Sequence, residues 1–166
     1  MSTRMFEEVK DRQAIDTLVQ LAREIWTEHY TPIIGAEQVE YMLRHMHSAE
    51  LIEKQIETGT YHYYLLKPEQ EAVGYFAVQL RDEELFLSKF YVHSRQRGKG
   101  LGRQALDFIR KLARQSERKK ITLTVNKYNS NSIAAYCKFG FVKTGELCVD
   151  IGNSFVMDDI SMELSV

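Results

Sequence analysis

Three glycines at alternate positions, Gly98, Gly100 and Gly102, constrain the fold of this chain more than any other feature. They lie between residues 85–92, an apolar run that predicts a strand, and residues 101–115, whose apolar spacing predicts a helix. Glycine has no Cβ, so backbone amides at these positions can approach a ligand closely. The start of a helix adds unpaired N–H groups and the positive end of its dipole. The junction therefore predicts an anion site of the kind that holds phosphate.

Basic side chains surround the glycines with no acidic residue between them: Arg95, Arg97, Lys99 and Arg103. The plain alternative is a solvated basic turn. A P-loop is absent, because it needs four residues between its first glycine and a Gly-Lys-Ser/Thr triplet, and no segment has that spacing. The dinucleotide fingerprint G-x-G-x-x-G is also absent, because Gln104 and Ala105 follow the third glycine, which comes one residue early. Neither familiar phosphate loop explains the junction.

Length and composition indicate one soluble globular domain over residues 1–166. The chain has 166 residues, 44% hydrophobic and 27% charged, enough to bury a core. A net charge of −1 gives no support for a nucleic-acid or membrane role. The chain start lacks a signal-peptide core and no run reaches membrane-spanning length, so a cytoplasmic location is expected. Neither the two cysteines, Cys137 and Cys148, nor the histidines have metal-ligand spacing, so we expect free thiols and no metal site.

The hydrophobic patterns predict a mixed α/β fold in the order β-α-α-β-β-β-α-β-α-β-β. The expected strands are residues 4–9, 61–66, 73–80, 85–92, 121–125, 141–150 and 155–164. The expected helices are residues 12–29, ended by Pro32, then 36–59 with a new cap at Ser48, 101–115, and one from Asn129 to Gly140. The three consecutive middle strands predict an antiparallel meander, and the strand–helix–strand unit around the glycines predicts a parallel pair.

A second pattern follows the fifth predicted strand. It consists of Asn129, Ser132, Tyr136, Gly140 and Phe141. Together with Arg-x-x-Gly-x-Gly over residues 97–102, and with the element order, this pattern resembles the GNAT superfamily of N-acetyltransferases. The resemblance covers nearly the whole chain and is most specific over residues 87–141. It implies a GNAT-like fold whose central sheet splays between its fourth and fifth strands.

The resemblance also implies an acyltransferase that moves an acetyl group from acetyl-coenzyme A to a primary amine by direct attack. It implies these cofactor-binding residues: Phe90, Tyr91, Val92, Arg97, Gly98, Lys99, Gly100, Leu101, Gly102, Arg103, Asn129 and Ser132. Tyr136 is the implied general acid, since a phenol with a reference pKa near 10 stays protonated at neutral pH. Alternatively, Tyr136 packs with Phe139 and Phe141. Cys137 is expected to be a buried structural thiol rather than a nucleophile.

The general base is left open by the sequence. Many family members carry a glutamate on the strand before the glycines, and Ser88 stands in that strand here. An alkyl amine is mostly protonated at neutral pH, so some group must accept its proton. The candidates are Glu84, His29 or a water chain past Ser88.

The resemblance implies an acceptor site lined by the first two helices, their connection and the last hairpin. Aromatic and acidic residues occur there: Trp26, Glu28, His29, Tyr30, Tyr41, Asp150, Asp158 and Asp159. This mixture suits a cationic amine, with a polyamine or other small amine favoured and a protein amine second. Aminoglycosides remain open, and the acidic residues can equally form an ordinary solvated face. The competing class is an acyl-coenzyme A-binding sensor or partner module of the same fold without catalysis. A homodimer is compatible with the sequence.

Overall fold

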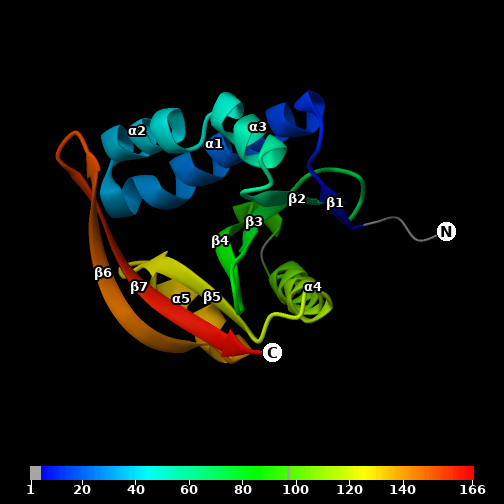
Figure 1. Cartoon of the computed structure of the whole chain (residues 1–166). Helices are drawn as coiled ribbons and strands as arrows, with labels where there is room; N and C mark the ends of the chain where they lie inside the picture. Colours follow the sequence, from blue (N-terminus) through cyan, green and yellow to red (C-terminus); the bar gives the residue numbers. More distant parts are fainter. Residues whose placement is uncertain (1–4, 97) are drawn as a thin grey trace. The chain divides into compact units, whose positions relative to one another are not determined.

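The computed structural model describes residues 5–96 and 98–166 of the chain (Figure 1). The N-terminal elements are β1 (Phe6–Glu8), α1 (Arg12–Ile34), α2 (Ala36–Met46), α3 (Ala49–Glu57), β2 (His62–Leu66) and β3 (Gly74–Leu80). The later elements are β4 (Glu84–Val92), a short 3-10 helix η1 (Ser94–Gln96), α4 (Leu101–Gln115), β5 (Lys120–Asn126), α5 (Ser130–Phe139), β6 (Val142–Gly152) and β7 (Phe155–Ser165). Arg97 and the predicted strand start at Arg4 lie outside the described residues.

Within the described residues, seven strands form one sheet in the order β1-β2-β3-β4-β5-β7-β6. The β4–β5 pair is parallel, and the pairs β1–β2, β2–β3, β5–β7 and β6–β7 are antiparallel. The chain forms two compact units. The first unit is Met1–Gln79 with Lys89–Leu106, and the second unit is Leu80–Ser88 with Asp107–Val166. The mixed α/β class and the element order predicted from the sequence are confirmed.

In the first unit, α1 begins where the sequence predicted and ends later. The Asp11 carboxylate accepts a hydrogen bond from the Ala14 N–H at 2.8 Å, which caps the helix. The prediction that Pro32 ends α1 is wrong, because Pro32 lies inside its last turn and the helix continues to Ile34. A proline so near the end removes one backbone hydrogen bond without interrupting a long ladder. Gly35 ends the helix, with a φ of +89° that favours glycine.

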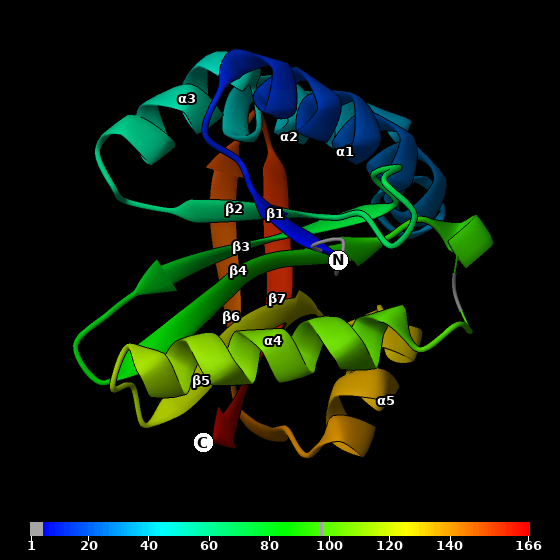
Figure 2. The same ribbon diagram turned by 90° about the vertical axis from the view of Figure 1, so that its right-hand side faces the viewer.

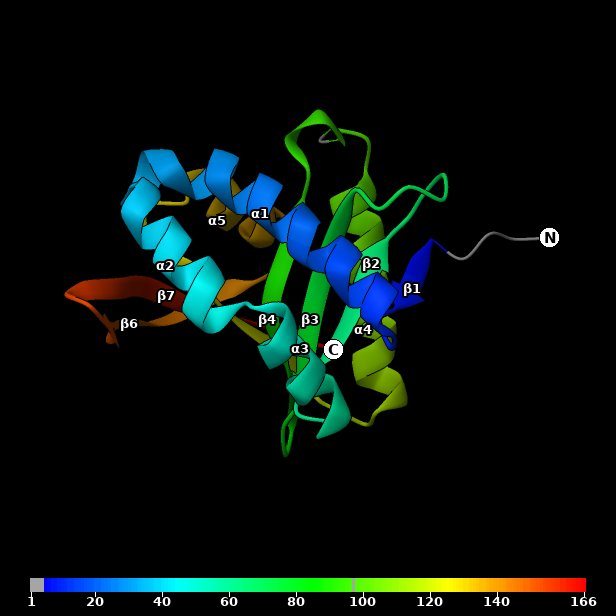
Figure 3. The ribbon, with the colours of Figure 1, turned by 90° about the horizontal axis from the view of Figure 1, so that it is seen from above.

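The other two helices of this unit begin with recognisable boundaries. α2 starts directly after Gly35, and the Ser48 hydroxyl accepts a hydrogen bond from the Leu51 N–H at 3.2 Å at the start of α3. Figures 2 and 3 show α1, α2 and α3 on one face of β1, β2 and β3. Side chains between these helices and strands are wholly buried, among them Leu18, Ile52 and Tyr75. Burial of this apolar surface holds the helices to the sheet.

The strands β3 and β4 run in opposite directions, as the predicted meander requires. The Arg81 N–H donates to the Glu84 carbonyl at 2.9 Å, and the His93 N–H donates to the Val73 carbonyl at 2.7 Å. Gly74 permits the close approach of the two strands, because a Cβ there would lie 2.5 Å from the carbonyl oxygen of Tyr91.

The second unit is built around β5. Its parallel ladder with β4 runs from Glu84–Lys120 to Leu87–Leu123, and its antiparallel ladder with β7 ends at Asn126–Asp159. Alternate β5 side chains are buried, as the sequence pattern predicted. β6 and β7 form a long hairpin (Figure 1). Within residues 5–96 and 98–166, every helix is too short or too polar to span a lipid bilayer.

Candidate active site

The glycine turn of the first unit joins η1 to α4. Gly98 and Gly100 have φ values of +79° and +78°, which favour glycine. No described atom lies within 4 Å of a Cβ placed at either residue, so conformation rather than space requires glycine here. The first helical bond of α4 runs from the Gln104 N–H to the Gly100 carbonyl at 3.1 Å. The amides of residues 101–103 therefore precede the helical ladder and are available to an anion by helix geometry.

The basic side chains of this turn are engaged to different extents. The Arg95 guanidinium lies 3.5 Å from the Glu71 carboxylate. The Lys99 ammonium donates to the Gln96 side-chain oxygen at 3.2 Å and is exposed. Arg103 is exposed on the first turn of α4. Lys99 and Arg103 are thus exposed cations beside the start of α4, whereas Arg95 is paired with Glu71. Arg97, the fourth predicted cation, lies outside the described residues.

The predicted cofactor strand is the C-terminal half of β4. The last pair of the parallel ladder is Leu87–Leu123, and β4 continues beyond it to Val92. Phe90, Tyr91 and Val92 in this segment are each half-buried. Gly102 lies close by, since a Cβ on it would be 3.9 Å from the Phe90 ring. An alanine at residue 102 would make an ordinary van der Waals contact there.

Tyr91 is anchored by aromatic side chains of the first unit. Its hydroxyl lies 2.9 Å from that of Tyr30, a hydrogen bond between half-buried groups. Its ring centroid is 5.6 Å from Trp26 and 5.5 Å from Tyr75. The Tyr91 side chain is therefore occupied inside the protein, and any cofactor contact would come from its backbone.

The expectation that Trp26 lies at the rim of an acceptor site is wrong, because its side chain is buried. It is 3% exposed and stacks on His47, with ring centroids 4.9 Å apart and planes 4° from parallel. Its place on the buried stripe of α1, beside Ile25, explains this. His47 bonds through Nε2 to the Tyr75 hydroxyl at 3.1 Å. Burial, and then the charge of Lys89, lower the pKa of His47 well below its ordinary value, which keeps the ring neutral.

Lys89 is a partly buried cation that the sequence analysis did not single out. It is half-buried next to Ser88 on β4, with its ammonium 6.0 Å from the centre of the Tyr61 ring. Burial lowers its pKa to about 8. The only sequence signal was a lysine inside an apolar run, which is equally typical of an exposed strand position.

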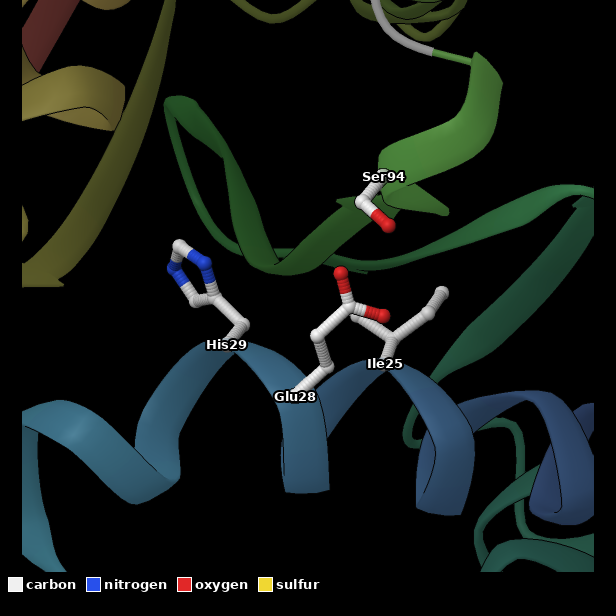
Figure 4. Close-up of a pocket in the computed structure, with 4 residues that line it drawn as sticks. All are labelled: Ile25, Glu28, His29 and Ser94. Atoms are coloured by element: carbon white, nitrogen blue, oxygen red, sulfur yellow. The ribbon is translucent and has the colours of Figure 1, made fainter.

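A small pocket lies between α1 and η1, within the first unit (Figure 4). Its volume is about 120 Å³, and it is lined by Ile25, Glu28, His29 and Ser94. In Figure 4 the Glu28 carboxylate points toward Ser94, and His29 projects from the same helix beside it. The pocket therefore combines a carboxylate, an imidazole and a hydroxyl.

A larger pocket of about 670 Å³ shares Glu28 and extends along α1 and α2. Its acidic residues are Glu24, Glu28 and Glu40. Arg23 pairs with Glu40 at 2.8 Å and offsets that charge. His93 Nε2 lies 3.8 Å from the Glu24 carboxylate. Two adjacent turns of α1 thus present Glu24 and Glu28 to one pocket.

The second unit positions the other predicted residues on α5. Asn129 is 5% exposed, and its side-chain oxygen accepts a hydrogen bond from the Ser132 N–H at 3.4 Å, so it caps the helix. Tyr136 is half-buried, with its ring edge-on to Phe141 at 5.4 Å. Both residues thus have a local structural contact in addition to any role in catalysis. The expectation that Cys137 is buried is wrong, because it lies on the exposed face of α5.

The predicted carboxylates have different surroundings. Glu84, at the start of β4, accepts a hydrogen bond from the Thr122 hydroxyl. It lies six residues from Phe90, or roughly 20 Å along a strand, which argues against a role as base near the glycine turn. Asp158 pairs with Lys127 at 2.6 Å, and Asp150 accepts from the Gly152 N–H at 2.8 Å in the hairpin. Asp159 is only 4% exposed and does not belong to a solvated face.

Among the described residues, no three His, Cys, Asp or Glu side chains are grouped so that they could hold a metal ion.

Comparisons with known proteins agree with the resemblance seen in the sequence. Residues 30–164 match the acetyltransferase (GNAT) domain. Spermine/spermidine N(1)-acetyltransferase of Bacillus subtilis (strain 168) is 35% identical over 68 residues, a match that spans 40% of this chain and 45% of that relative.

Two solved structures share the fold. PaiA N-acetyltransferase from Thermoplasma acidophilum, in complex with coenzyme A, superposes with a TM-score of 0.77 over 100% of both chains at 21% identity. A GNAT family acetyltransferase from Elizabethkingia anophelis with acetyl-CoA bound has a TM-score of 0.59, 20% identity, and coverage of 75% of this chain and 88% of its own. Because the domain match covers most of its length, this chain belongs to the GNAT family of acetyltransferases.

Proposed function

We propose that this protein transfers the acetyl group of acetyl-coenzyme A to a primary amine of a small polycationic acceptor, as a single catalytic domain over residues 1–166. The observation that carries the proposal is the junction of β4, the glycine turn and α4. Its positive φ values at Gly98 and Gly100, followed by the open amides of α4, suit a pyrophosphate. Coenzyme A and acetyl-CoA in two proteins of the same fold support this choice of cosubstrate.

Main-chain groups would do most of the cosubstrate binding. The amides from Gly98 to Arg103 would hold the pyrophosphate, with Lys99, Arg103 and Arg97 adding positive charge. Backbone groups of Phe90, Tyr91 and Val92 would pair with the pantetheine arm as an added strand, since β4 continues beyond its last pair with β5. The same backbone row would polarise the thioester carbonyl. Asn129 and Ser132 would contact the arm from the start of α5.

The reaction joins the amine nitrogen to the acetyl carbon and breaks the carbon–sulfur bond. Tyr136 would donate its hydroxyl proton to the departing thiolate, so that coenzyme A leaves as the thiol. The contact of Tyr136 with Phe141 would hold the phenol in a fixed orientation for this transfer.

The acidic pockets of the first unit favour a polyamine acceptor. Glu24 and Glu28 are four residues apart on α1, so they share one face and are separated by about 6 Å along the axis. Val39 and Ala36 line the same pocket and can contact the methylene groups of a linear amine. A relative named for acetylation of spermine and spermidine supports this acceptor class.

The test measures thiol release from acetyl-coenzyme A with spermidine, a mono-amine of similar length and a neutral-tailed amino acid. We expect the highest kcat/KM for spermidine. Equal values for all three would contradict the polyamine preference. Calorimetric binding of coenzyme A without release by any amine would favour the sensor or partner module, and no binding at all would overturn the proposal.

A further inference from the structure

We propose that Asp159 of β7 is the general base, which accepts a proton from the acceptor amine before acetyl transfer. This inference depends on the proposed function. Such a base is needed because an alkyl ammonium has a pKa near 10 and cannot attack a thioester. β4 offers Ser88 instead of a carboxylate, and Glu84 lies at the opposite end of that strand.

The position of Asp159 is set by the ladder between β5 and β7. Asp159 faces Asn126, the last residue of β5, in the last pair of that ladder. Because β5 runs parallel to β4, this is a carboxyl end of the parallel pair, the edge at which α/β proteins hold ligands. The chain passes from Asn126 directly to Asn129 and α5, the helix of Tyr136. Asp159 thus borders the strand end that leads to the proposed general acid.

Asp159 is more deeply buried than its neighbour Asp158. Asp159 is 4% exposed, whereas the Asp158 side chain is 33% exposed and ion-paired with Lys127. Across the hairpin, Asp159 faces the uncharged Leu147, with Glu146 on the adjoining position of β6. Asp158 and Glu146 are thus acidic neighbours of Asp159 along the hairpin, and the cation Lys127 is paired with Asp158.

These surroundings suit a proton acceptor. Burial first, and then the negative charge of Asp158, raise the pKa of Asp159 above its ordinary value. A carboxylate with a raised pKa is a stronger base than an exposed one and works closer to neutral pH. A buried carboxylate also destabilises the fold, so its presence at a ligand-binding edge is more consistent with chemistry than with stability.

The protons balance over one turnover. The ammonium gives one proton to Asp159, and the neutral amine attacks the acetyl carbon. As the carbon–nitrogen bond forms and the carbon–sulfur bond breaks, the sulfur takes the proton of Tyr136, and a second proton from nitrogen restores Tyr136. Asp159 then releases its proton to solvent. The products are the N-acetyl amine, coenzyme A as the thiol and one proton.

The experiment compares Asp159→Asn with Glu163→Gln, a carboxylate of the same strand that pairs with Lys120 and has no proposed role in the site. It follows kcat/KM for spermidine against pH. The wild type should rise through the pKa of Asp159 to a plateau. The kcat/KM of Asp159→Asn for spermidine should be roughly 10²–10⁴-fold lower than that of the wild type at pH 7. Its activity should then follow the fraction of neutral amine, so that the deficit shrinks as pH rises. Glu163→Gln should keep the wild-type pH dependence, with kcat/KM within about twofold of wild type.

Two further measurements separate chemistry from folding. Coenzyme A affinity, by calorimetry, should be unchanged in Asp159→Asn. Its thermal midpoint at pH 7 should rise, because a carboxylate whose folded pKa is raised destabilises the protein once pH exceeds that pKa. Asp159→Glu keeps the carboxylate and should retain the plateau at lower activity, which tests the role even if the asparagine variant fails to fold.

Several results would overturn the inference. One is a pH dependence of kcat/KM in Asp159→Asn that has the same shape as in the wild type. Another is a plateau of kcat/KM that is lost in Lys89→Met and kept in Asp159→Asn. If both Asp159 variants fail to fold, Asp159 is structural and the proposal is wrong. A wild-type protein that acetylates no amine would contradict the proposed function itself, which is a distinguishable outcome.

Discussion

The glycine turn of the first unit and the helix α5 of the second unit would serve the proposed function in different ways. The turn would act through its main chain, with φ values near +80° at Gly98 and Gly100 and helix amides beyond them. α5 would act through side chains, and each has a structural contact: Asn129 caps the helix, and Tyr136 packs on Phe141. A backbone site leaves a glycine pattern in the sequence, whereas a side chain in contact with its neighbours does not reveal its second role.

The largest expected effect tests the proposed main-chain binding of coenzyme A at the glycine turn. Gly100→Asp should abolish coenzyme A binding, because it places a carboxylate beside amides that would hold a pyrophosphate. Isothermal calorimetry measures the affinity. Gly59→Asp is the matched control, since Gly59 has a similar φ of +72° and equally open space but lies after α3. Unchanged affinity in Gly100→Asp would remove the anion site from the proposal.

Gly100→Asn refines that result. Asparagine tolerates positive φ and carries no charge, so this variant retains the conformation at modest strain. It should bind coenzyme A more weakly than wild type but more tightly than Gly100→Asp. Equal loss in both variants would mean that the side chain itself, rather than its charge, excludes the ligand.

The next effect tests the proposed role of the Tyr136 side chain on α5. Tyr136→Phe should lower kcat by roughly 10²–10⁴-fold while leaving coenzyme A affinity nearly unchanged, because it removes a proton donor and little shape. Steady-state kinetics with the best acceptor measure it. Tyr128→Phe serves as the control, since Tyr128 is 64% exposed just before α5. If Tyr136→Phe keeps kcat within about twofold of wild type, the contact with Phe141 is the whole role of Tyr136.

Local interactions explain which parts of the molecule were predictable. Asp11, Ser48 and Asn129 cap their helices as predicted, because a cap depends on residues three positions away. The order of the elements along the chain followed from alternation and short loops. The burial of Asp159 was not predictable, since it depends on which faces of distant elements meet.

Pro32 shows the same limit at a helix end. Its local rule predicts a stop, but the helix continues because the next residue able to turn the chain is Gly35. Lys89 was missed for a related reason: its surroundings include Tyr61 and His47, which are far away in sequence.

A moderate effect on stability is expected at two glycines, one close to a backbone atom in the first unit and one close to a side-chain atom in the second unit. Gly74→Ala should destabilise the fold by about 1–3 kcal/mol, because its Cβ would lie 2.5 Å from the Tyr91 carbonyl, which cannot rotate away. Gly145→Ala should cost less, since its nearest atom, at 3.2 Å, is the side-chain hydroxyl of Ser161, which can rotate away at the cost of its hydrogen bond to Thr144. Chemical denaturation measures both. Equal decreases in the free energy of unfolding would show that β3 and β4 can move apart at Gly74 without a large energetic cost.

The smallest expected effect concerns acceptor choice and extends the comparison to an exposed side chain. Glu28→Gln should raise KM for spermidine about threefold at low salt, because partly exposed charge pairs contribute about 0.2–1 kcal/mol. kcat should not change, since Glu28 would hold a nitrogen that does not react. The effect should fade in 1 M salt, where the screening length falls to about 3 Å. Glu37→Gln, an exposed change on α2, is the control. A KM increase that is equal for spermidine and a mono-amine, or that persists in high salt, would mean that Glu28 shapes the pocket without selecting a second positive charge.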